Sequence, residues 1–163
     1  MTRAPYIAVC GPGKANDQEA AWAEEVGRLI AQAGVMLVCG GLGGVMDAAA
    51  RGAKSVGGVS VGLLPGDERD EAGPHLTVAV PTGLGEARNA LVVRAADAVI
   101  AISGEFGTLS EIALALKMGK PVVGLSTWEL AKAGRPVDAI VRATTPEEAV
   151  RAALDAIEEG TST

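Results

Sequence analysis

Short, continuous apolar runs alternate with longer amphipathic segments along most of the chain. The runs lie at residues 6–10, 35–39, 58–64, 76–80, 98–102 and 121–125. They are apolar at successive positions, as expected for parallel strands that are covered on both faces. Apolar residues recur at helical spacing in residues 16–34, 45–57, 84–97, 108–119 and 144–160. The pattern predicts an α/β fold, a Rossmann-like, doubly wound parallel sheet of six or seven strands in three α/β/α layers.

Capping signals mark the ends of two of these helices. Asn16 followed by Glu19 predicts a reciprocal N-terminal cap, and Gly34 predicts the end of the same helix. Thr145 as cap with Pro146 at the first helical position predicts the start of the last helix.

The chain carries no internal boundary or repeat. Its 163 residues therefore predict one Rossmann-like nucleotide- or phosphate-binding domain over residues 1–163. Residues 65–75 are typical of a polar surface loop. Residues 126–144 follow neither period, and their structure is not predicted.

Composition excludes several classes of partner. A net charge of −6 argues against nucleic-acid binding, and four aromatic residues leave little for base stacking. No apolar run approaches the roughly 18–20 residues of a membrane span, and the start of the chain is too short in apolar residues for a signal peptide. We therefore expect a cytoplasmic protein in which Cys10 and Cys39 are reduced.

Metal and triad chemistry also find little support. The single histidine, His75, and the two cysteines would need carboxylates to complete a zinc site. A Ser-His-Asp triad would have to use His75, and no G-x-S-x-G motif accompanies it. We predict no metal site and no required cofactor.

Glycine is unusually abundant, at 22 of 163 residues, and is concentrated where predicted strands end. Turns at 10–14, 39–44 and 103–108 lead from strands towards helices, and in an open parallel sheet such exits share the ligand-binding edge. Main-chain N–H groups at helix starts suit phosphate. The alternative is that these glycines only permit tight turns. The predicted ligand-binding residues are Gly11, Gly13, Lys14, Gly40, Gly41, Gly43, Gly44, Gly104, Gly107 and Thr108.

Neither named phosphate fingerprint is complete. The pattern G-x-G-x-x-G has Asn16 or Met46 at its sixth position here. A Walker A loop is excluded because neither Lys14 nor Lys120 is followed by Ser or Thr.

The stretch Thr108-Leu109-Ser110-Glu111 allows two interpretations of Glu111. It matches a capping box, in which threonine and glutamate satisfy each other's backbone donors. Alternatively, Glu111 is a functional carboxylate that faces a partner across a cleft.

Arg88 is the candidate partner. It falls in the first turn of a helix that is predicted to begin near Gly85, where a cation is disfavoured by ~0.3–1 kcal/mol. A nearby anion would explain this placement, as would a surface pair with Glu86. If strand 76–80 neighbours strand 98–102, Arg88 and Glu111 project over one cleft.

Three stretches together resemble the Lonely Guy-type superfamily: GGLGGVMDAA, GLGEARN and GEFGTLSEIALALKMGKPVVGL. The family pattern is P-G-G-x-G-T-x-x-E, with an Arg-Lys pair on the preceding helix. Members of its phosphoribohydrolase branch cleave nucleoside 5′-monophosphates into base and ribose 5-phosphate. The resemblance implies that Gly107 and Thr108 hold phosphate, with Arg88 and Glu111 as catalytic residues. A carboxylate can stabilise the oxocarbenium-like sugar left by the departing base.

Three departures from that pattern are similar to a sister branch of the superfamily. Ser103 replaces the proline, Glu105 the second glycine and Asn89 the lysine. The sister branch includes molybdenum cofactor carrier proteins, which hold a phosphorylated pterin and perform no chemistry. The resemblance thus implies binding of a nucleotide or molybdopterin-type ligand, with molybdenum cofactor as cargo; the alternative is a phosphoribohydrolase. It also implies a homo-oligomer, a dimer or a tetramer.

One further function and the positions of the two cysteines stay open. A non-catalytic sensor domain would need a partner protein, whereas lysine decarboxylation is excluded because no lysine lies in a pyridoxal-phosphate context. Cys10 and Cys39 each end a predicted strand before a glycine loop, so they lie either at the cleft or in the core.

Overall fold

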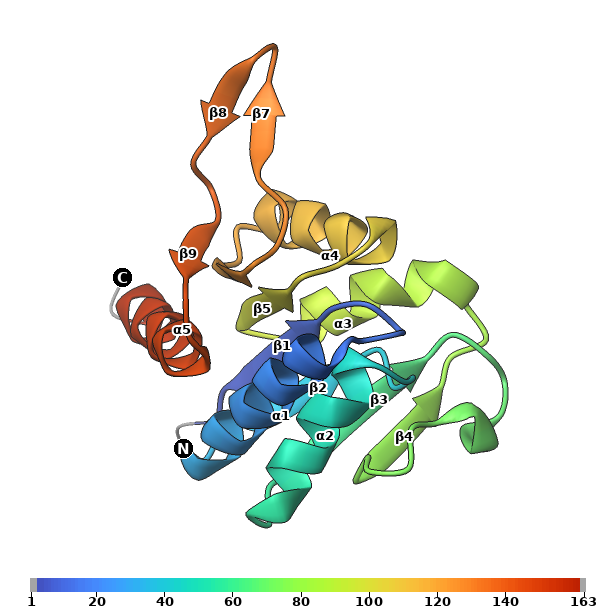
Figure 1. Ribbon diagram of the computed structural model, residues 1–163. Helices are drawn as coiled ribbons and strands as arrows, with labels where there is room; N and C mark the ends of the chain where they lie inside the picture. The colour runs from blue at the N-terminus through green and yellow to red at the C-terminus, as the bar shows by residue number, and fades with distance from the viewer. Residues whose placement is uncertain (1–2, 162–163) are drawn as a thin grey trace.

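The computed structural model describes residues 3–161 and places a parallel sheet between two layers of helices (Figure 1). The sheet has seven strands in the order β4-β3-β2-β1-β5-β6-β9. Its strands are β1 (Tyr6–Cys10), β2 (Met36–Cys39), β3 (Ser60–Leu64), β4 (Val78–Pro81), β5 (Ala98–Ile102), β6 (Val122–Leu125) and β9 (Val141–Ala143). The helices are α1 (Asp17–Gln32), α2 (Val45–Ser55), α3 (Asn89–Ala95), α4 (Phe106–Lys117) and α5 (Pro146–Thr161), with 3₁₀ turns η1 (Arg69–Glu71) and η2 (Gly85–Arg88). The expected fold class is confirmed.

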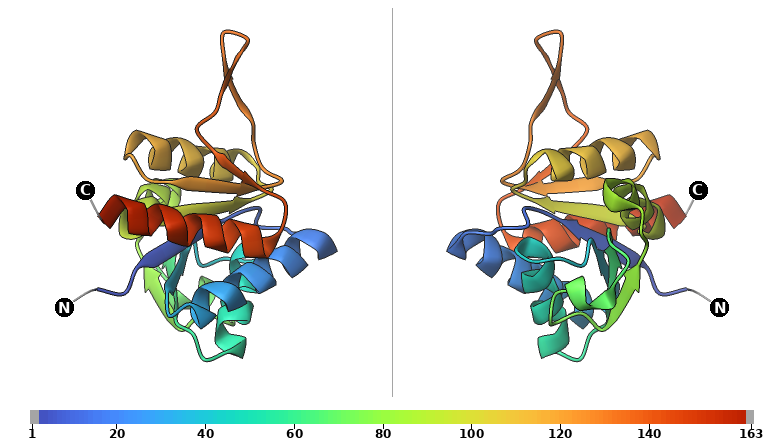
Figure 2. Two further views of the ribbon diagram at one scale, coloured as in Figure 1. Left: turned by 90° about the vertical axis from the view of Figure 1, so that its left-hand side faces the viewer. Right: turned by 90° about the vertical axis from the view of Figure 1, so that its right-hand side faces the viewer.

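Each face of the sheet carries its own apolar cluster, which explains why the strand sequences are continuously apolar. Along β1, Ile7 and Val9 pack with residues of α1, α2 and α5. Ala8 and Cys10 point to the other face and pack with residues of α3 and α4. Figure 2 shows the two helical layers on either side of the sheet.

The predicted helix caps are present. The backbone N–H of Glu19 donates to Asn16 Oδ1, and that of Asn16 donates to Glu19 Oε2, both at 2.9 Å. Gly34 follows α1 with a φ of +74°, which glycine adopts without strain. At the start of α5, the N–H of Glu148 donates to Thr145 Oγ1 at 3.2 Å, directly before Pro146.

The path of the chain differs from the expectation at one point. From β1 in the middle of the sheet, it runs outward through β2 and β3 to β4 at the edge. It then crosses back through η2 and α3 to β5, on the other side of β1. The expected pairing of strand 76–80 with strand 98–102 is therefore wrong, because β4 pairs with β3 and β5 pairs with β1 and β6.

The segment 126–144, which follows no period in the sequence, contains a projecting hairpin. Strands β7 (Leu130–Lys132) and β8 (Arg135–Val137) form an antiparallel pair that stands away from the body (Figures 1 and 2). The chain then returns to the sheet as β9, the seventh strand. Residues 65–75 run mostly along the surface, as expected, with η1 as their regular turn.

Membrane-spanning helices and metal-binding clusters are both absent from the described part of the chain. Among residues 3–161, every helix is too short or too polar to cross a bilayer. Within the same residues, no three His, Cys, Asp or Glu side chains come together in a way that could hold a metal ion.

Candidate functional site

The three glycine-rich loops leave the neighbouring strands β2, β1 and β5. The chain's direction across the sheet reverses between β1 and β5, so the loops meet at the switch point where open α/β sheets bind ligands. A cleft of about 300 Å³ opens there. It is lined by Val9, Cys10, Gly11, Pro12, Gly13, Leu42, Met46, Pro65, Glu86, Arg88, Asn89, Glu105, Gly107, Thr108 and Glu111.

Glycines let the β1 and β2 loops touch. A Cβ on Gly44 would lie 2.2 Å from the carbonyl oxygen of Pro12, and Gly44 has a φ of +63°. The N–H of Val45 donates to that same oxygen at 3.1 Å. A Cβ on Gly11 would lie 2.6 Å from Cγ1 of Val45. These contacts make the two loops one rigid wall of the cleft.

Half of the twelve residues predicted for the site line the cleft, and the others lie behind or beside it. The lining ones are Gly11, Gly13, Arg88, Gly107, Thr108 and Glu111. Gly40 lies under Arg88, where a Cβ would come 2.4 Å from Nη1. Lys14, Gly41, Gly43, Gly44 and Gly104 are also outside the lining set. The roles assigned to all of these residues remain predictions.

Arg88 and Glu111 do meet, although the expected route was wrong. Nη1 of Arg88 lies 3.9 Å from Oε1 of Glu111, and both residues are buried. A helical turn does begin at Gly85, as predicted, but it is the 3₁₀ turn η2, which Arg88 ends just before α3. The chain segment that crosses back from the sheet edge brings α3 alongside α4, and this contact places the two side chains together.

The guanidinium of Arg88 is incompletely satisfied. Nη1 donates to Oδ1 of Asn89 at 2.7 Å, while its distance to Glu111 is too long for a hydrogen bond. Within residues 3–161, Nε of Arg88 is the one buried side-chain polar atom without a hydrogen-bond partner. Gly40 provides the space that this side chain occupies.

The capping-box interpretation of Glu111 is wrong. α4 begins two residues earlier than expected, at Phe106, and its N-cap residue Glu105 makes no side-chain capping bond. Thr108 is therefore buried inside the first turn, and Glu111 falls in the second turn, at the cleft. The first-turn carbonyl of Gly107 instead accepts from Oγ of Ser110 at 2.6 Å.

Burial dominates the electrostatics of the cleft floor. It raises the pKa of Glu111 to about 7, against the lowering effects of a hydrogen bond from the Cys10 thiol and the charge of Arg88. Arginine keeps its charge throughout this range. Burial therefore disfavours the ionised form of Glu111 beside the Arg88 guanidinium. Glu86 and Glu105 are exposed and lie at the rim.

The two cysteines differ in position. Both are buried free thiols, but Cys10 lines the cleft whereas Cys39 is not among its lining residues. Burial, followed by the charge of Glu111, raises the pKa of Cys10 well above its usual range. Burial raises the pKa of Cys39 to about 11. Burial thus favours the protonated form of both thiols.

Several lining residues escaped the sequence analysis. Pro65 comes from the loop after β3, which carries no glycine motif pointing to a ligand. Leu42 and Met46 reach the cleft from the β2 loop and the start of α2. Their only signal was their position within the GGLGGVM stretch.

Comparison with known proteins agrees with this fold. A model of the SLOG cluster4 family matches residues 4–150. The chain belongs to the SLOG cluster4 family. The molybdenum cofactor binding protein from the phototrophic bacterium Rippkaea orientalis is 36% identical, with a TM-score of 0.86 over 100% of both chains. The molybdenum cofactor carrier protein from Chlamydomonas reinhardtii is 35% identical, with a TM-score of 0.85 over 96% of this chain and 99% of that one.

A relative found by sequence is also similar over most of the chain. An uncharacterized protein from Archaeoglobus fulgidus is 42% identical over 144 residues, which is 88% of this chain and 91% of that one. The resemblance to the Lonely Guy-type superfamily, near its molybdenum cofactor carrier branch, is confirmed by these matches.

Proposed function

We propose that this protein binds a phosphorylated heterocycle of the molybdopterin type in the cleft and carries it without chemical turnover. The observation that carries the proposal is the buried Arg88, whose Nε has no hydrogen-bond partner, at the point where three glycine loops converge. The two solved relatives, which are named for molybdenum cofactor binding and carriage and match nearly the whole chain, support the choice of ligand.

The start of α4 supplies the main-chain half of a phosphate site. Because Glu105 makes no side-chain cap, the first-turn N–H groups of α4 have no intrahelical or capping partner. Gly107 lies in that turn and lines the cleft, and a Cβ placed there would meet nothing within 4 Å. A phosphate can therefore approach the positive end of the helix closely.

Arg88 supplies the charged half. Its guanidinium is buried, its Nη1 lies 3.9 Å from Oε1 of Glu111, too far for a hydrogen bond, and its Nε has no hydrogen-bond partner. A phosphate oxygen bound to such a group gains a charge-assisted hydrogen bond, about twice as strong as a neutral one. Arg88 also fits a phosphate better than lysine would, because its planar fork can donate two parallel bonds.

Ser103 separates this chain from the hydrolase pattern. It has a φ of +51°, whereas the proline of P-G-G-x-G-T is restricted to a φ near −65°. The β5–α4 loop therefore follows a backbone path that is closed to the hydrolase proline. Glu111 is also only partly ionised at neutral pH, which weakens it as a carboxylate for an oxocarbenium-like transition state. Both observations favour binding over hydrolysis.

Calorimetry of the full chain tests the proposal, with molybdenum cofactor, GMP and AMP as separate titrants. We expect binding of at least the pterin ligand, and no free base when the same samples are incubated with the nucleotides. Release of base would establish a phosphoribohydrolase instead. Failure to bind any of the three ligands would contradict the proposal, and mass spectrometry of co-purifying small molecules would identify cargo directly.

Arg88→Ala should weaken binding by roughly 10–100-fold, the usual effect of losing a hydrogen bond to a charged group. Arg94→Ala is the matched control, because Arg94 is an exposed arginine on α3 outside the cleft. Equal affinity of the Arg88 variant and the wild type would remove Arg88 from the site. Homo-oligomer formation and a cytoplasmic location remain predictions of the sequence.

A further inference from the structure

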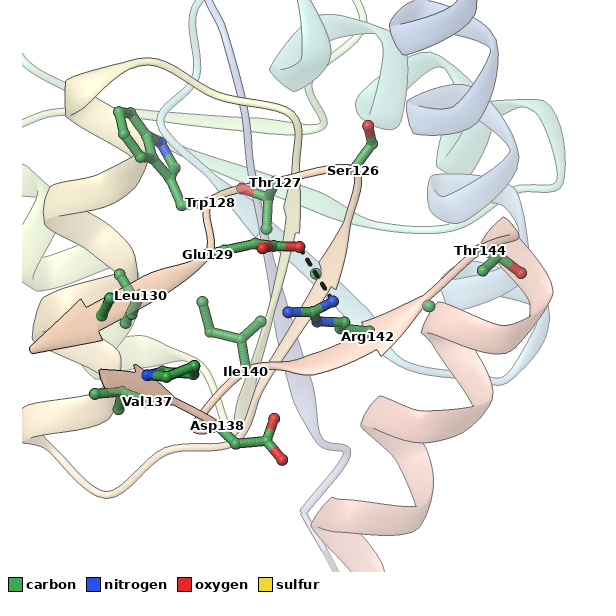
Figure 3. A pocket seen from close by; sticks show the side chains of 14 residues that line it. Ser126, Thr127, Trp128, Glu129, Leu130, Val137, Asp138, Ile140, Arg142 and Thr144 are labelled. Carbon is green, nitrogen blue, oxygen red and sulfur yellow. Dashed lines mark ion pairs between the residues drawn. The ribbon is translucent and has the colours of Figure 1, made fainter. Parts of the chain in front are cut away.

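A second cavity, at the root of the β7–β8 hairpin, is larger than the cleft. This hollow has a volume of about 790 Å³ and lies between β6, β9 and the hairpin (Figure 3). Thr127 and Trp128, which follow β6 after Ser126, are among its lining residues. The ion pair between Glu129 and Arg142 crosses it, as the dashed line in Figure 3 shows.

Thr127 and Trp128 also hold the back of the β5–α4 loop, whose front borders the ligand cleft. Oγ1 of Thr127 donates a hydrogen bond to the carbonyl of Ser103. Nε1 of Trp128 donates to the carbonyl of Glu105 at 3.3 Å. The ring of Trp128 also contacts that of Phe106, with 5.6 Å between their centroids. Thr127 and Trp128, which line the hollow, thus contact the β5–α4 segment, whose Glu105, Gly107 and Thr108 line the cleft.

This loop needs external support. Ser103 and Gly104 have φ values of +51° and +120°, a region that residues with a Cβ adopt rarely. Such conformations persist only when their surroundings fix them. Thr127 binds the carbonyl of Ser103. The N–H of Ser103 donates to the carbonyl of Leu125 at 3.0 Å. Two residues further on, Glu105 lines the cleft, followed by Gly107 and Thr108.

Thr127 is itself fixed by a glycine. A Cβ on Gly124 in β6 would lie 2.6 Å from Cγ2 of Thr127, so the threonine methyl rests directly on the strand. The hydroxyl is thereby directed at one acceptor, the carbonyl of Ser103.

We propose that Thr127 and Trp128 are positioning residues for the ligand cleft, which they serve by fixing the backbone of the β5–α4 loop. The inference rests on the proposed function, since it concerns the same site. By this inference the segment before β7 contributes to ligand binding, although its sequence has no phosphate motif and follows no helical or strand period.

Substitutions of Thr127 test the hydrogen bond. Thr127→Val keeps the shape and removes the donor, and we expect roughly three- to tenfold weaker binding of the calorimetric titrants, the equivalent of one hydrogen bond. Thr127→Ser keeps the hydroxyl and should recover most of that loss. Glu129→Gln is the matched control, because Glu129 lines the same hollow but pairs with Arg142 rather than with the loop.

Tryptophan emission distinguishes a positioning role of Trp128 from a purely structural one, because only a positioning role predicts that its emission responds to ligand. The chain has two tryptophans. Trp22→Phe leaves Trp128 as the reporter, and its emission should change when molybdenum cofactor or GMP fills the cleft. Trp128→Phe leaves Trp22, a residue of α1 that packs against the core, and its emission should not change when ligand is added. Circular dichroism of each variant verifies the fold.

The outcomes separate the two proposals. If the wild type binds the titrants, but Thr127→Val and Trp128→Phe bind equally well and Trp128 emission is unchanged, the positioning role is wrong and the proposed function stands. If the wild type binds none of them, both fall. Weaker binding of Thr127→Val, recovery in Thr127→Ser and a ligand-dependent Trp128 signal together support the inference.

Discussion

Two arginine–glutamate pairs lie at the two cavities, and they differ most in burial. Arg88 and Glu111 in the cleft are 3.9 Å apart, with side chains 10% and 8% exposed. Arg142 and Glu129 in the hollow are closer, at 3.1 Å, but 71% and 72% exposed. Water screens the shorter contact, whereas the longer one acts in a medium of lower effective dielectric constant. Burial, rather than distance, decides which pair can control the charge of its cavity.

The cavities themselves show the same contrast. The hollow has more than twice the volume of the cleft, about 790 Å³ against 300 Å³. Its walls come from β6, β9 and the base of the projecting hairpin, and more than half of its lining residues are exposed. The cleft is built from backbone turns and buried polar groups at the switch point of the sheet. The larger cavity is therefore not the one that we propose for the phosphate.

The glycines of the two regions should respond very differently to a methyl group. Gly44→Ala places its Cβ 2.2 Å from the carbonyl oxygen of Pro12 at a φ of +63°. Overpacking and backbone strain together should lower the free energy of unfolding by about 3–5 kcal/mol. Urea denaturation measures this difference directly.

Gly134→Ala is the control for that experiment. Gly134 also has a positive φ, +75°, but it lies in the hairpin turn, where an added methyl group would meet nothing within 4 Å. We expect a loss of about 1–2 kcal/mol or less, from the left-handed backbone alone. Similar losses at both positions would show that the contact between the β1 and β2 loops does not rigidify the cleft.

The sequence was most informative where one local rule determines the structure. Continuous apolar runs located the core strands, the reciprocal cap Asn16–Glu19 placed the start of α1 correctly, and Thr145 before Pro146 did so for α5. The start of α4 was misplaced because the Thr108–Glu111 spacing satisfied a capping rule that the loop geometry overrides. Arg88 and Glu111 were paired correctly from an incorrect strand order, since the long return from β4 to β5 leaves no trace in local patterns.

The hairpin was missed for a physical reason. Its two-residue turn, Ala133-Gly134, has positive φ at both positions, 50° and 75°. Such turns are usually signalled by Asn-Gly or Asp-Gly, and alanine conceals this one. The strands β7 and β8 are mostly exposed, so no apolar alternation marks them either.

Glu111→Gln should stabilise the protein increasingly as pH rises. In the wild type, burial raises the carboxyl pKa from an ordinary value of 4.5 to about 7. Below pH 4.5 the Glu111 carboxyl is protonated in both the folded and the unfolded chain. The contribution of the neutral carboxyl to the free energy of unfolding is then fully present. As pH rises through 7, that stability is lost, by about 3 kcal/mol in total. The glutamine of the variant does not ionise, so the variant keeps its stability as pH rises.

Urea denaturation of the wild type and of Glu111→Gln at several pH values between 4 and 9 measures the difference in their free energies of unfolding. It should widen with pH in favour of the glutamine variant and level off above neutrality. Glu129→Gln is the control, since removing a partner from an exposed pair should change stability by less than about 1 kcal/mol throughout. A constant gap for Glu111→Gln would mean that its carboxyl is more hydrated in solution than its burial indicates.

The smallest effect is expected for the exposed pair itself. A double-mutant cycle with Glu129→Ala and Arg142→Ala should give a coupling energy below about 1 kcal/mol, because both side chains are largely in water. Added salt should reduce it further. A coupling well above that value, and insensitive to salt, would require the hollow to be covered in solution. The pair would then be buried as Arg88 and Glu111 are, and the hollow would have to be treated as an interface.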